Sequence, residues 1–267
     1  MKNTNEEVYK HSPRDVELHP PGSPKIFKPA GCSRTVKWLS ETLQIKSCAL
    51  IFDCGGTGKT AAARWFIAHK LKRWLCYVCL PLAEEDMQRL YNLVLSLVNS
   101  AYAVGLVLDE MDKLGSTKYL GVLGWILKIL DMQSVKVIII TNRPWIIKEQ
   151  YFEVWRRIMD DGAIYYTDPP HTKNEMLHII NAVIKKLNLK ERVNLTYEEK
   201  VKLATIMAKE GWNFKSVEEI FGKLKSLEKI NYRNIMEIKD ATLYNWEPPL
   251  CMENIRVYLN ELHKTGI

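Results

Sequence analysis

One stretch of the sequence combines residues that can hold phosphate groups: the run from Cys48 to Ala63, CALIFDCGGTGKTAAA. An apolar segment leads into a glycine loop, and an alanine-rich, helix-forming segment follows it. Glycines let successive backbone N–H groups turn toward one point, and the following helix directs the positive end of its dipole to that point. In this arrangement the Lys59 ammonium group would reach the β- and γ-phosphates of a nucleotide, and the Thr60 hydroxyl would hold Mg²⁺. The candidate nucleotide-binding residues are Gly55, Gly56, Thr57, Gly58, Lys59, Thr60 and Ala61.

The loop departs from the usual phosphate-binding pattern at one position. That pattern is GxxxxGK[ST], and Asp53 stands where its first glycine is expected. The closing GKT sequence still fits, and Gly55 and Gly56 supply flexibility nearby. A glycine-rich turn that binds nothing is the alternative, but strand and helix flank the loop as phosphate binding requires. Cys54 within the loop would be a small filler or an oxidation-sensitive thiol.

A pair of carboxylates follows a second apolar strand. Asp109 and Glu110 end the segment GLVLDE, about 50 residues after Lys59. There Asp109 would hold Mg²⁺ through water, and Glu110 would polarise an attacking water; a solvated strand end is the alternative for the pair alone. Together with the phosphate loop, the pair supplies the cradle, metal and oriented nucleophile that phosphoryl transfer needs. ATP is favoured over GTP because no NKxD element follows the later strands.

The composition is that of an ordinary soluble globular protein, with 47% hydrophobic and 26% charged residues among 267. The net charge of +7 permits a polyanionic partner such as DNA, although the spread of the basic residues equally fits a solvated surface. The uncharged stretch from Leu90 to Leu108 is interrupted by polar residues, so it predicts a helix and a strand, and no membrane partner is expected.

Cys76 and Cys79 lie in a predicted strand that sends their sulfurs to opposite faces of the sheet. The two thiols are therefore not expected to bind one metal ion together. Without a signal peptide, free thiols in the cytoplasm are expected.

Strands alternate with helices after the first 30 or so residues, which predicts a parallel sheet with helices on both faces. The predicted strands are Ala49–Phe52, Trp74–Leu80, Ala103–Leu108, Val135–Ile140 and Ala163–Tyr166. The helices predicted among them are Ser33–Leu43, Lys59–Lys72, Glu84–Val98, Lys118–Leu130 and Lys148–Ile158. Ligands of such sheets bind beyond the C-terminal ends of the strands, where the glycine loop, the Asp109–Glu110 pair and Asn142 all fall.

The composition changes after Pro170, and only helices are predicted beyond it. They are Lys173–Leu187, Thr196–Glu210, Phe214–Leu227 and Met252–His263, with a turn near Tyr232–Asp240. We therefore expect an extended N-terminal arm over 1–32, a phosphate-loop core over 33–169 and a helical domain over 170–267. The predicted fold class is α/β: a P-loop NTPase sheet sandwiched by helices, with a smaller all-helical C-terminal domain.

The segments GGTGKT, LVLDE, IIITNRP and WRRI share the order and spacing of motifs in the AAA+ ATPase superfamily, which the chain resembles over roughly residues 33–230. The resemblance implies that the GKT sequence is Walker A and that Asp109 and Glu110 belong to Walker B. It also implies that Asn142 is sensor 1, which helps to position the attacking water. The implied cofactors are ATP and Mg²⁺.

Arg156 or Arg157 falls at the place of the arginine finger, which in this superfamily reaches the γ-phosphate bound by a neighbouring subunit. The resemblance therefore implies a homo-oligomer with ATP sites at subunit boundaries. A surface pair on an amphipathic helix is the alternative for the two arginines. The helical domain resembles the AAA+ lid, but Phe214 stands where the sensor 2 arginine is expected. Lys215, next in line, is the remaining candidate, with a surface lysine as the alternative.

Within the superfamily, the chain is similar to the compact DnaA/Cdc6-like ATPases of archaeal viruses and plasmids. This implies an ATPase that remodels DNA or a replication protein in the cytoplasm, the host cytoplasm if the protein is viral. Superfamily 3 helicases of small DNA viruses are a second relative, because TNRPW and WRRI resemble their motif C and arginine finger. An ATP-gated DNA- or protein-binding regulator with little hydrolysis and a small-molecule kinase stay open as alternatives.

Overall fold

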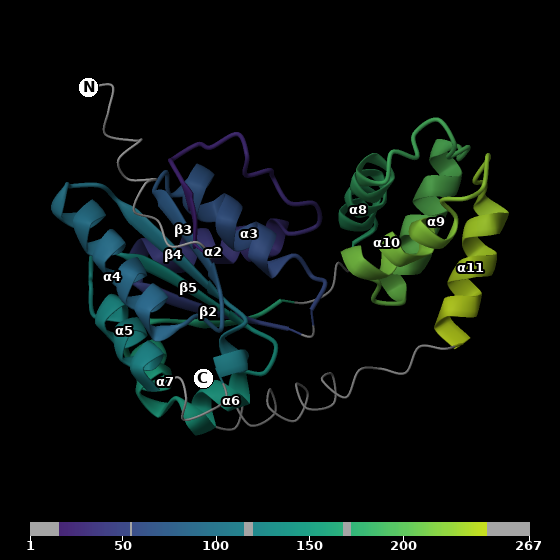
Figure 1. Cartoon of the computed structure of the whole chain (residues 1–267). Helices are drawn as coiled ribbons and strands as arrows, with labels where there is room; N and C mark the ends of the chain where they lie inside the picture. The colour runs from purple at the N-terminus through teal and green to yellow at the C-terminus, as the bar shows by residue number, and fades with distance from the viewer. Residues whose placement is uncertain (1–15, 54, 115–119, 168–171, 245–267) are drawn as a thin grey trace. The chain divides into compact units, whose positions relative to one another are not determined.

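The structure is a computed structural model that describes residues 16–53, 55–114, 120–167 and 172–244, without the side chains of 242–244. Contacts divide the described chain into two compact units (Figure 1). The core unit comprises residues 16–28, 34–53 and 59–166, and the helical unit comprises residues 29–33, 55–58 and 167–244. The Cys54 thiol, the start of the predicted helix at Lys118 and the predicted helix Met252–His263 lie outside the described residues.

A six-stranded sheet organises the described part of the core unit, in the order β1-β3-β4-β5-β2-β6. Its strands are β1 (Val16–His19), β2 (Cys48–Phe52), β3 (Trp74–Cys79), β4 (Val104–Asp109), β5 (Lys136–Thr141) and β6 (Ile164–Tyr166). β1 pairs antiparallel with β3, and the other neighbouring strands run parallel. The sequence predicts β2 to β6 to within one residue at each end, and this alternation of strands and helices is confirmed.

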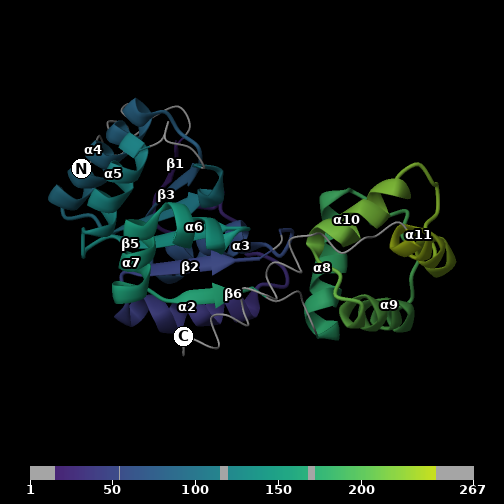
Figure 2. The same cartoon turned by 90° about the horizontal axis from the view of Figure 1, so that it is seen from below.

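Helices cover both faces of the sheet, which is why β2, β4 and β5 are buried along almost their whole length (Figures 1 and 2). One face carries α2 (Ser33–Ile45), α3 (Lys59–Trp65) and the π-helical turn Phe66–Lys70 that continues α3. The opposite face carries α4 (Glu84–Asn99), α5 (Leu120–Leu130) and α7 (Phe152–Asp161). Because side chains alternate along a strand, Leu75 packs in the core cluster of the α2–α3 face, whereas its neighbour Cys76 belongs to the other face.

Two elements of the core unit differ from the sequence-based expectation. Val16–His19 lies within the predicted extended arm, yet it forms edge strand β1 because its main chain pairs with β3. The predicted helix Lys148–Ile158 consists of two helices, α6 (Pro144–Gln150) and α7. Tyr151 separates them with φ −124° and ψ 50°, which lies outside the helical region. Pro144 stands at the start of α6, where its missing N–H has no intrahelical acceptor to lose.

Helices α8 to α11 build the described part of the helical unit around one apolar core. They are α8 (Lys173–Lys186), α9 (Tyr197–Lys209), α10 (Phe214–Lys223) and α11 (Tyr232–Tyr244). Thr172 and Thr196 each begin a helix with a capping box, in which the threonine and a glutamate three residues later exchange hydrogen bonds with main-chain N–H groups. The turn predicted near Tyr232–Asp240 is instead the continuous helix α11, because buried Ile235 packs in the core of this unit. None of the described helices is both long and apolar enough to cross a membrane.

Candidate nucleotide site

Three neighbouring strand ends gather the predicted phosphate- and metal-binding residues of the core unit. β5 lies between β2 and β4, so Asp53, Asn142 and Asp109, which end or follow these strands, share one edge of the sheet. Lys59 and Thr60 open α3 at the same edge, directly after the glycine loop. We call Lys59, Thr60, Asp109, Glu110 and Asn142 the nucleotide site.

Lys59 is 6% exposed, and its ammonium group contacts two of these strand ends. Nζ donates a hydrogen bond to the Asp53 carbonyl oxygen at 3.1 Å and another to Asn142 Oδ1 at 3.2 Å. The phosphate-binding lysine and the sensor 1 asparagine of the sequence prediction are therefore in direct contact. Asp53 does not adopt the left-handed backbone region, so the aspartate replaces the usual glycine without backbone strain.

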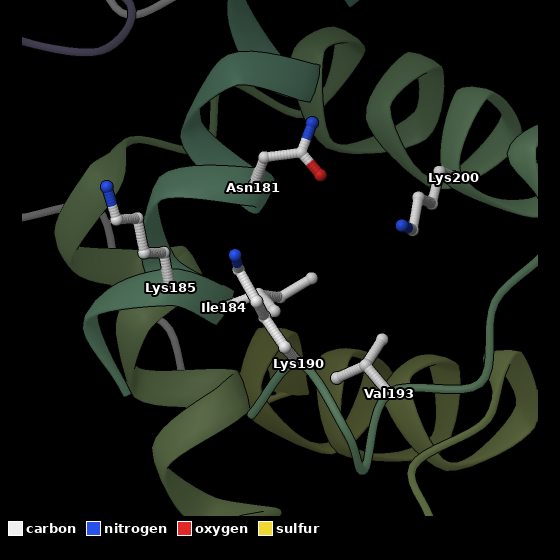
Figure 3. A pocket seen from close by; sticks show the side chains of 6 residues that line it. All are labelled: Asn181, Ile184, Lys185, Lys190, Val193 and Lys200. Atoms are coloured by element: carbon white, nitrogen blue, oxygen red, sulfur yellow. The ribbon is translucent and has the colours of Figure 1, made fainter. Parts of the chain in front are cut away.

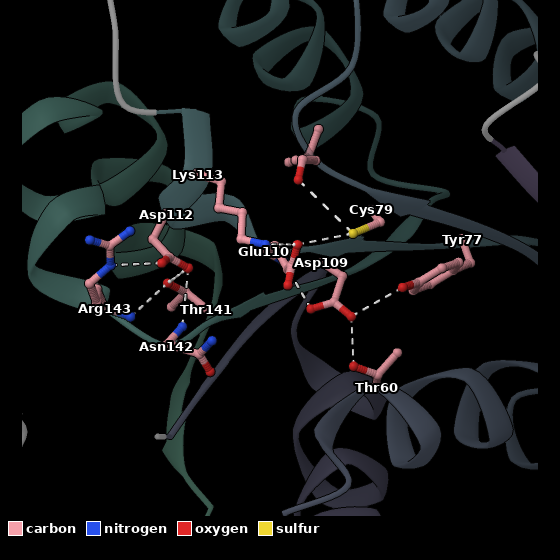
Figure 4. A network of polar contacts seen from close by, with 11 residues as sticks. Thr60, Tyr77, Cys79, Asp109, Glu110, Asp112, Lys113, Thr141, Asn142 and Arg143 are labelled. Carbon is pink, nitrogen blue, oxygen red and sulfur yellow. Dashed lines mark hydrogen bonds and ion pairs between the residues drawn. The ribbon is translucent and has the colours of Figure 1, made fainter. Parts of the chain in front are cut away.

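Asp109 is 7% exposed, and three donors point at its carboxylate (Figure 4). Thr60 Oγ1 donates to Oδ2 at 2.6 Å, the Tyr77 hydroxyl donates to the same oxygen at 3.2 Å, and the Glu110 N–H donates to Oδ1 at 2.9 Å. Burial and then the Asp109 charge raise the pKa of Tyr77 above its ordinary value, so the hydroxyl keeps the proton that it donates. A carboxylate and a hydroxyl at this separation offer the hard oxygen ligands that Mg²⁺ prefers, so Thr60 and Asp109 fit the predicted metal.

Glu110 has a left-handed backbone conformation with φ 57°, which is uncommon for a residue with a side chain. Its Oε2 atom accepts hydrogen bonds from Lys113 Nζ at 2.5 Å and from the Cys79 thiol at 3.2 Å (Figure 4). The hydrogen bond from Lys113 is the main cause that lowers the pKa of Glu110. Burial, followed by the hydrogen bond to Glu110, raises the pKa of Cys79 to about 11. Two donors thus hold the predicted catalytic carboxylate.

Asp112 is a buried carboxylate that the sequence reasoning did not single out. It is 5% exposed and lies in the 3₁₀ turn Met111–Leu114. Oδ1 accepts hydrogen bonds from Thr141 Oγ1 at 2.8 Å and from the Asn142 N–H at 3.2 Å, and Oδ2 accepts one from Arg143 Nε at 2.9 Å. Burial raises the pKa of Asp112, but these hydrogen bonds outweigh it and hold the pKa below its ordinary value. The sequence carried a signal for this ion pair. DEMD places the acidic Asp112 two residues after Glu110, and TNRP places the basic Arg143 directly after Asn142.

Known structures share this architecture. The structure of C. elegans PCH-2 has a TM-score of 0.57 and 13% identity, over 91% of this chain and 75% of that chain. The structure of Rhizobiales Trip13 has a TM-score of 0.56 and 15% identity, over 85% of this chain and 97% of that chain. A katanin structure that addresses katanin self-assembly has a TM-score of 0.60 and 15% identity, over 88% of this chain and 89% of that chain. These neighbours are AAA+ ATPases.

The chain has an AAA+ fold. No family model and no curated protein sequence matches the chain, so the likeness is one of fold. It confirms the predicted fold class. It does not confirm the narrower resemblance to DnaA/Cdc6-like ATPases.

The glycine loop of this AAA+ fold belongs by its contacts to the helical unit. Gly55, Gly56 and Gly58 have φ values of 103°, 77° and 82°, a region that residues with a side chain rarely adopt. A Cβ atom on Gly58 would also come within 2.6 Å of Cys32 Sγ. Within the same unit, Asn213 Nδ2 donates a hydrogen bond to the Gly55 carbonyl oxygen at 3.3 Å. Glycine is therefore required where the loop turns its main chain.

The other predicted nucleotide-binding residues surround this loop or follow it. Lys215, the sensor 2 candidate, is exposed, and its Cβ lies 3.0 Å from where a Cβ on Gly56 would stand, so it neighbours the loop within the helical unit. The Thr57 and Thr167 hydroxyls are hydrogen-bonded at 3.2 Å. Ala61 is exposed on the first turn of α3.

The two candidate finger arginines lie apart from the nucleotide site. Arg156 pairs with Glu153 at 3.1 Å and with Asp160 at 3.2 Å, both on its own helix α7. Arg157 contacts Asp131 through Nε at 2.9 Å and Nη2 at 3.2 Å, and it also pairs with Glu153. Both arginines line a cavity of about 330 Å³ in the core unit. No hydrogen bond or ion pair between described residues joins either arginine to the nucleotide site.

Proposed function

We propose that this chain is a Mg²⁺-dependent ATPase of the AAA+ type that acts as a homo-oligomer. The observation that carries the proposal is the 2.6 Å contact between the Thr60 hydroxyl and the Asp109 carboxylate, next to the buried ammonium group of Lys59. These groups are the phosphate-binding and metal-binding parts that phosphoryl transfer needs, and they lie where α/β sheets bind their ligands. The AAA+ fold supports the same chemistry.

Each residue of the nucleotide site has a task in this proposal. Lys59 exchanges its contacts with the Asp53 carbonyl and Asn142 for phosphate oxygens. Mg²⁺, when bound, screens the negative charge of the phosphates. Glu110 orients the attacking water and accepts its proton, which requires that Lys113 and Cys79 release the carboxylate first. The Asn142 side chain, freed from Lys59, helps to hold the same water.

We infer the oligomer from Arg156 and Arg157, which lie apart from the nucleotide site of their own chain. A cation at the γ-phosphate stabilises the charge that develops during transfer. Among the described residues, no hydrogen bond or ion pair joins Arg156 or Arg157 to the nucleotide site of its own chain. Arg156 or Arg157 would supply that cation to the site of a neighbouring subunit. The katanin structure, which concerns self-assembly, supports an oligomeric arrangement for a protein of this fold.

The work that such an ATPase performs is the remodelling of a macromolecular client. The sequence resemblance points to DNA or a replication protein, but the structural neighbours give no support to a replication role. The proposal therefore extends to ATP-driven remodelling, with the client defined only as a macromolecule.

Two substitutions test the proposal. Lys59→Ala should abolish binding of a fluorescent ATP analogue, whereas Glu110→Gln should bind ATP with unchanged affinity and cleave it at least a hundredfold more slowly, about the effect of losing a general base. Lys37→Ala and Glu85→Gln, which change exposed residues of α2 and α4, serve as matched controls. Equal turnover by Glu110→Gln and the unsubstituted chain would overturn the catalytic assignment. Unchanged binding by Lys59→Ala would overturn the nucleotide site itself.

A second candidate function is an ATP-gated regulator with little hydrolysis. The observation in its favour is that Lys113 and Cys79 both engage the Glu110 carboxylate. If those contacts persist in the ATP-bound protein, ATP stabilises one conformation and is cleaved slowly. Steady-state ATP turnover by the purified chain, with duplex and single-stranded DNA added in turn, separates the regulator from the ATPase.

A further inference from the structure

A second cavity lies within the helical unit, between α8, the segment 187–196 and α9. Its volume is about 420 Å³, and its lining residues are Asn181, Ile184, Lys185, Lys190, Val193 and Lys200. Figure 3 shows the polar ends of Asn181, Lys190 and Lys200 extending toward the cavity from three different segments, with Lys185 at its edge. Ile184 is buried, so the cavity combines an apolar floor with a cationic rim. None of the described residues that line it is a carboxylate.

The three lysines of this cavity form no ion pair with any described residue. Two of the charged residues beside them in sequence are engaged elsewhere. Glu199, next to Lys200, accepts a hydrogen bond from the Thr196 N–H at 2.8 Å and caps α9. Lys186, next to Lys185, pairs with Glu218 at 2.8 Å. The Lys190 and Lys200 ammonium groups therefore extend toward one cavity, with Lys185 at its edge, and none of the described lining residues supplies a counter-charge. A bound anion would relieve the repulsion among these lysines.

The segment that carries Lys190 and Val193 is held in place by main-chain hydrogen bonds. Val193 forms a parallel bridge with Ile230. The Ile230 N–H donates to the Arg192 carbonyl oxygen at 2.8 Å, and the Asn194 N–H donates to the Ile230 carbonyl oxygen at 2.8 Å. The backbone of the rim is thus ordered before any ligand arrives, which lowers the entropy cost of binding.

We propose that this cavity binds a ligand that carries two or more phosphate groups. A lysine ammonium is a compact charge with three donors and no preferred plane, which suits a tetrahedral phosphate approached from several sides. The planar fork of arginine matches carboxylate and phosphate alike, and the described lining residues present lysines as their cationic side chains. Three cationic side chains suit a multiply charged ligand. Both a free polyphosphate and the phosphodiester backbone of a nucleic acid have this chemistry.

The site shares no residue with the nucleotide site, so the inference does not depend on the proposed function. It is tested on the full chain carrying Lys59→Ala, which removes the phosphate lysine of the nucleotide site from every sample alike. The pocket variant adds Lys185→Gln, Lys190→Gln and Lys200→Gln. The matched control adds Lys173→Gln, Lys209→Gln and Lys225→Gln, three exposed lysines of the same unit outside the cavity. Circular dichroism confirms that each variant folds.

Three probes are titrated: tripolyphosphate by calorimetry, and a single-stranded oligothymidine and a poly-glutamate peptide of equal charge by fluorescence anisotropy. The pocket variant should bind a phosphate probe roughly tenfold or more weakly than the control variant, since one charged hydrogen bond alone is worth about that factor. For the oligonucleotide, the slope of log K against log salt should fall by about 2 when three lysines are lost.

The probes distinguish the two sources of phosphate. Lysine-dependent binding of tripolyphosphate alone identifies a free polyphosphate, and lysine-dependent binding of the oligonucleotide alone identifies a nucleic-acid backbone. The inference is overturned if neither phosphate probe binds or if the pocket and control variants lose affinity equally. It is also overturned if poly-glutamate binds as tightly as both tripolyphosphate and the oligonucleotide.

Discussion

The Tyr77 hydroxyl of β3 donates a hydrogen bond across 3.2 Å to the carboxylate of Asp109 at the end of β4. The Arg64 guanidinium lies over the Tyr77 ring, 4.6 Å from its centroid, and pairs with Glu17 of β1. Edge strand β1, which the sequence does not predict, is therefore connected to the proposed metal-binding carboxylate through two side chains. Because Tyr77 donates to the same oxygen as Thr60, it helps to orient the carboxylate on which the metal depends.

Tyr77→Phe removes that hydroxyl and keeps the ring. The loss of one hydrogen bond of about 1 kcal/mol should weaken Mg²⁺ binding about fivefold, because Asp109 loses an orienting donor. The measurement is the Mg²⁺ concentration needed for half-maximal binding of a fluorescent ATP analogue. Tyr91→Phe, whose ring packs on Trp125 in the same unit, is the control. An unchanged Mg²⁺ requirement would show that Thr60 and the Glu110 N–H orient Asp109 without Tyr77.

Lys113→Met frees Glu110 from its strongest described donor. Lys113 lowers the pKa of Glu110, so the substitution should make the carboxylate a stronger base and raise steady-state ATP turnover by a factor of a few. Lys37→Met, on an exposed face of α2, controls for the loss of one surface charge. A fall in turnover would instead mean that Lys113 holds Glu110 in its working position.

Asp112→Asn tests the buried network that connects the end of β4 to Asn142. In the folded chain the pKa of Asp112 lies below its ordinary value of 3.8, so its stabilisation is present above about pH 4 and is lost as pH falls through the folded value. The substitution should cost about 2 kcal/mol of unfolding free energy at pH 7, because Arg143 loses a charged acceptor. Urea unfolding at pH 7 and at pH 3 measures the effect, and the difference from the unsubstituted chain should shrink at pH 3.

An equal difference at both pH values would show that the charge of Asp112 contributes nothing. Asp86→Asn, at an exposed ion pair with Arg89, provides the comparison, because a pair of that kind contributes little at either pH.

Arg156 and Arg157 differ in how firmly the chain holds them. Arg157 makes two hydrogen bonds to Asp131, which lies after α5, whereas the partners of Arg156 are three and four residues away on α7. Pairs of the second kind are worth only a few tenths of a kcal/mol, so Arg156 is the easier of the two to release. We therefore expect Arg156→Ala to lose most ATP turnover and to recover it when mixed with Lys59→Ala chains. Arg157→Ala should chiefly lower the melting temperature.

The mixing experiment works because one chain then supplies an intact nucleotide site and the other an intact arginine. Recovery by Arg157→Ala and not by Arg156→Ala would reverse the assignment. If neither mixture recovers, the proposal that subunits share a site is wrong. Mass measurement in solution with a non-hydrolysable ATP analogue tests for the oligomer independently.

The sequence by itself determined the elements that present the nucleotide site. Apolar runs that alternate with helical periods predict β2 to β6 and most of the helices between them, because each pattern depends on residues close together in the chain. The glycine loop could be located for the same reason, since its need for left-handed backbone and a helix start is local. That Asn142 would lie near Lys59 followed from the rule that parallel strands end at one edge.

Only the tertiary structure decided which side chains meet. The contact of Lys59 with Asn142 depends on β5 lying between β2 and β4, and the bonds of Asp112 to Arg143 and of Tyr77 to Asp109 join residues 31 and 32 positions apart. No local period encodes such contacts, because strand order is set by how all the helices pack on the sheet. Edge strand β1 was hidden for the same reason: its four residues are held by pairing with β3, and a segment that short carries no period of its own.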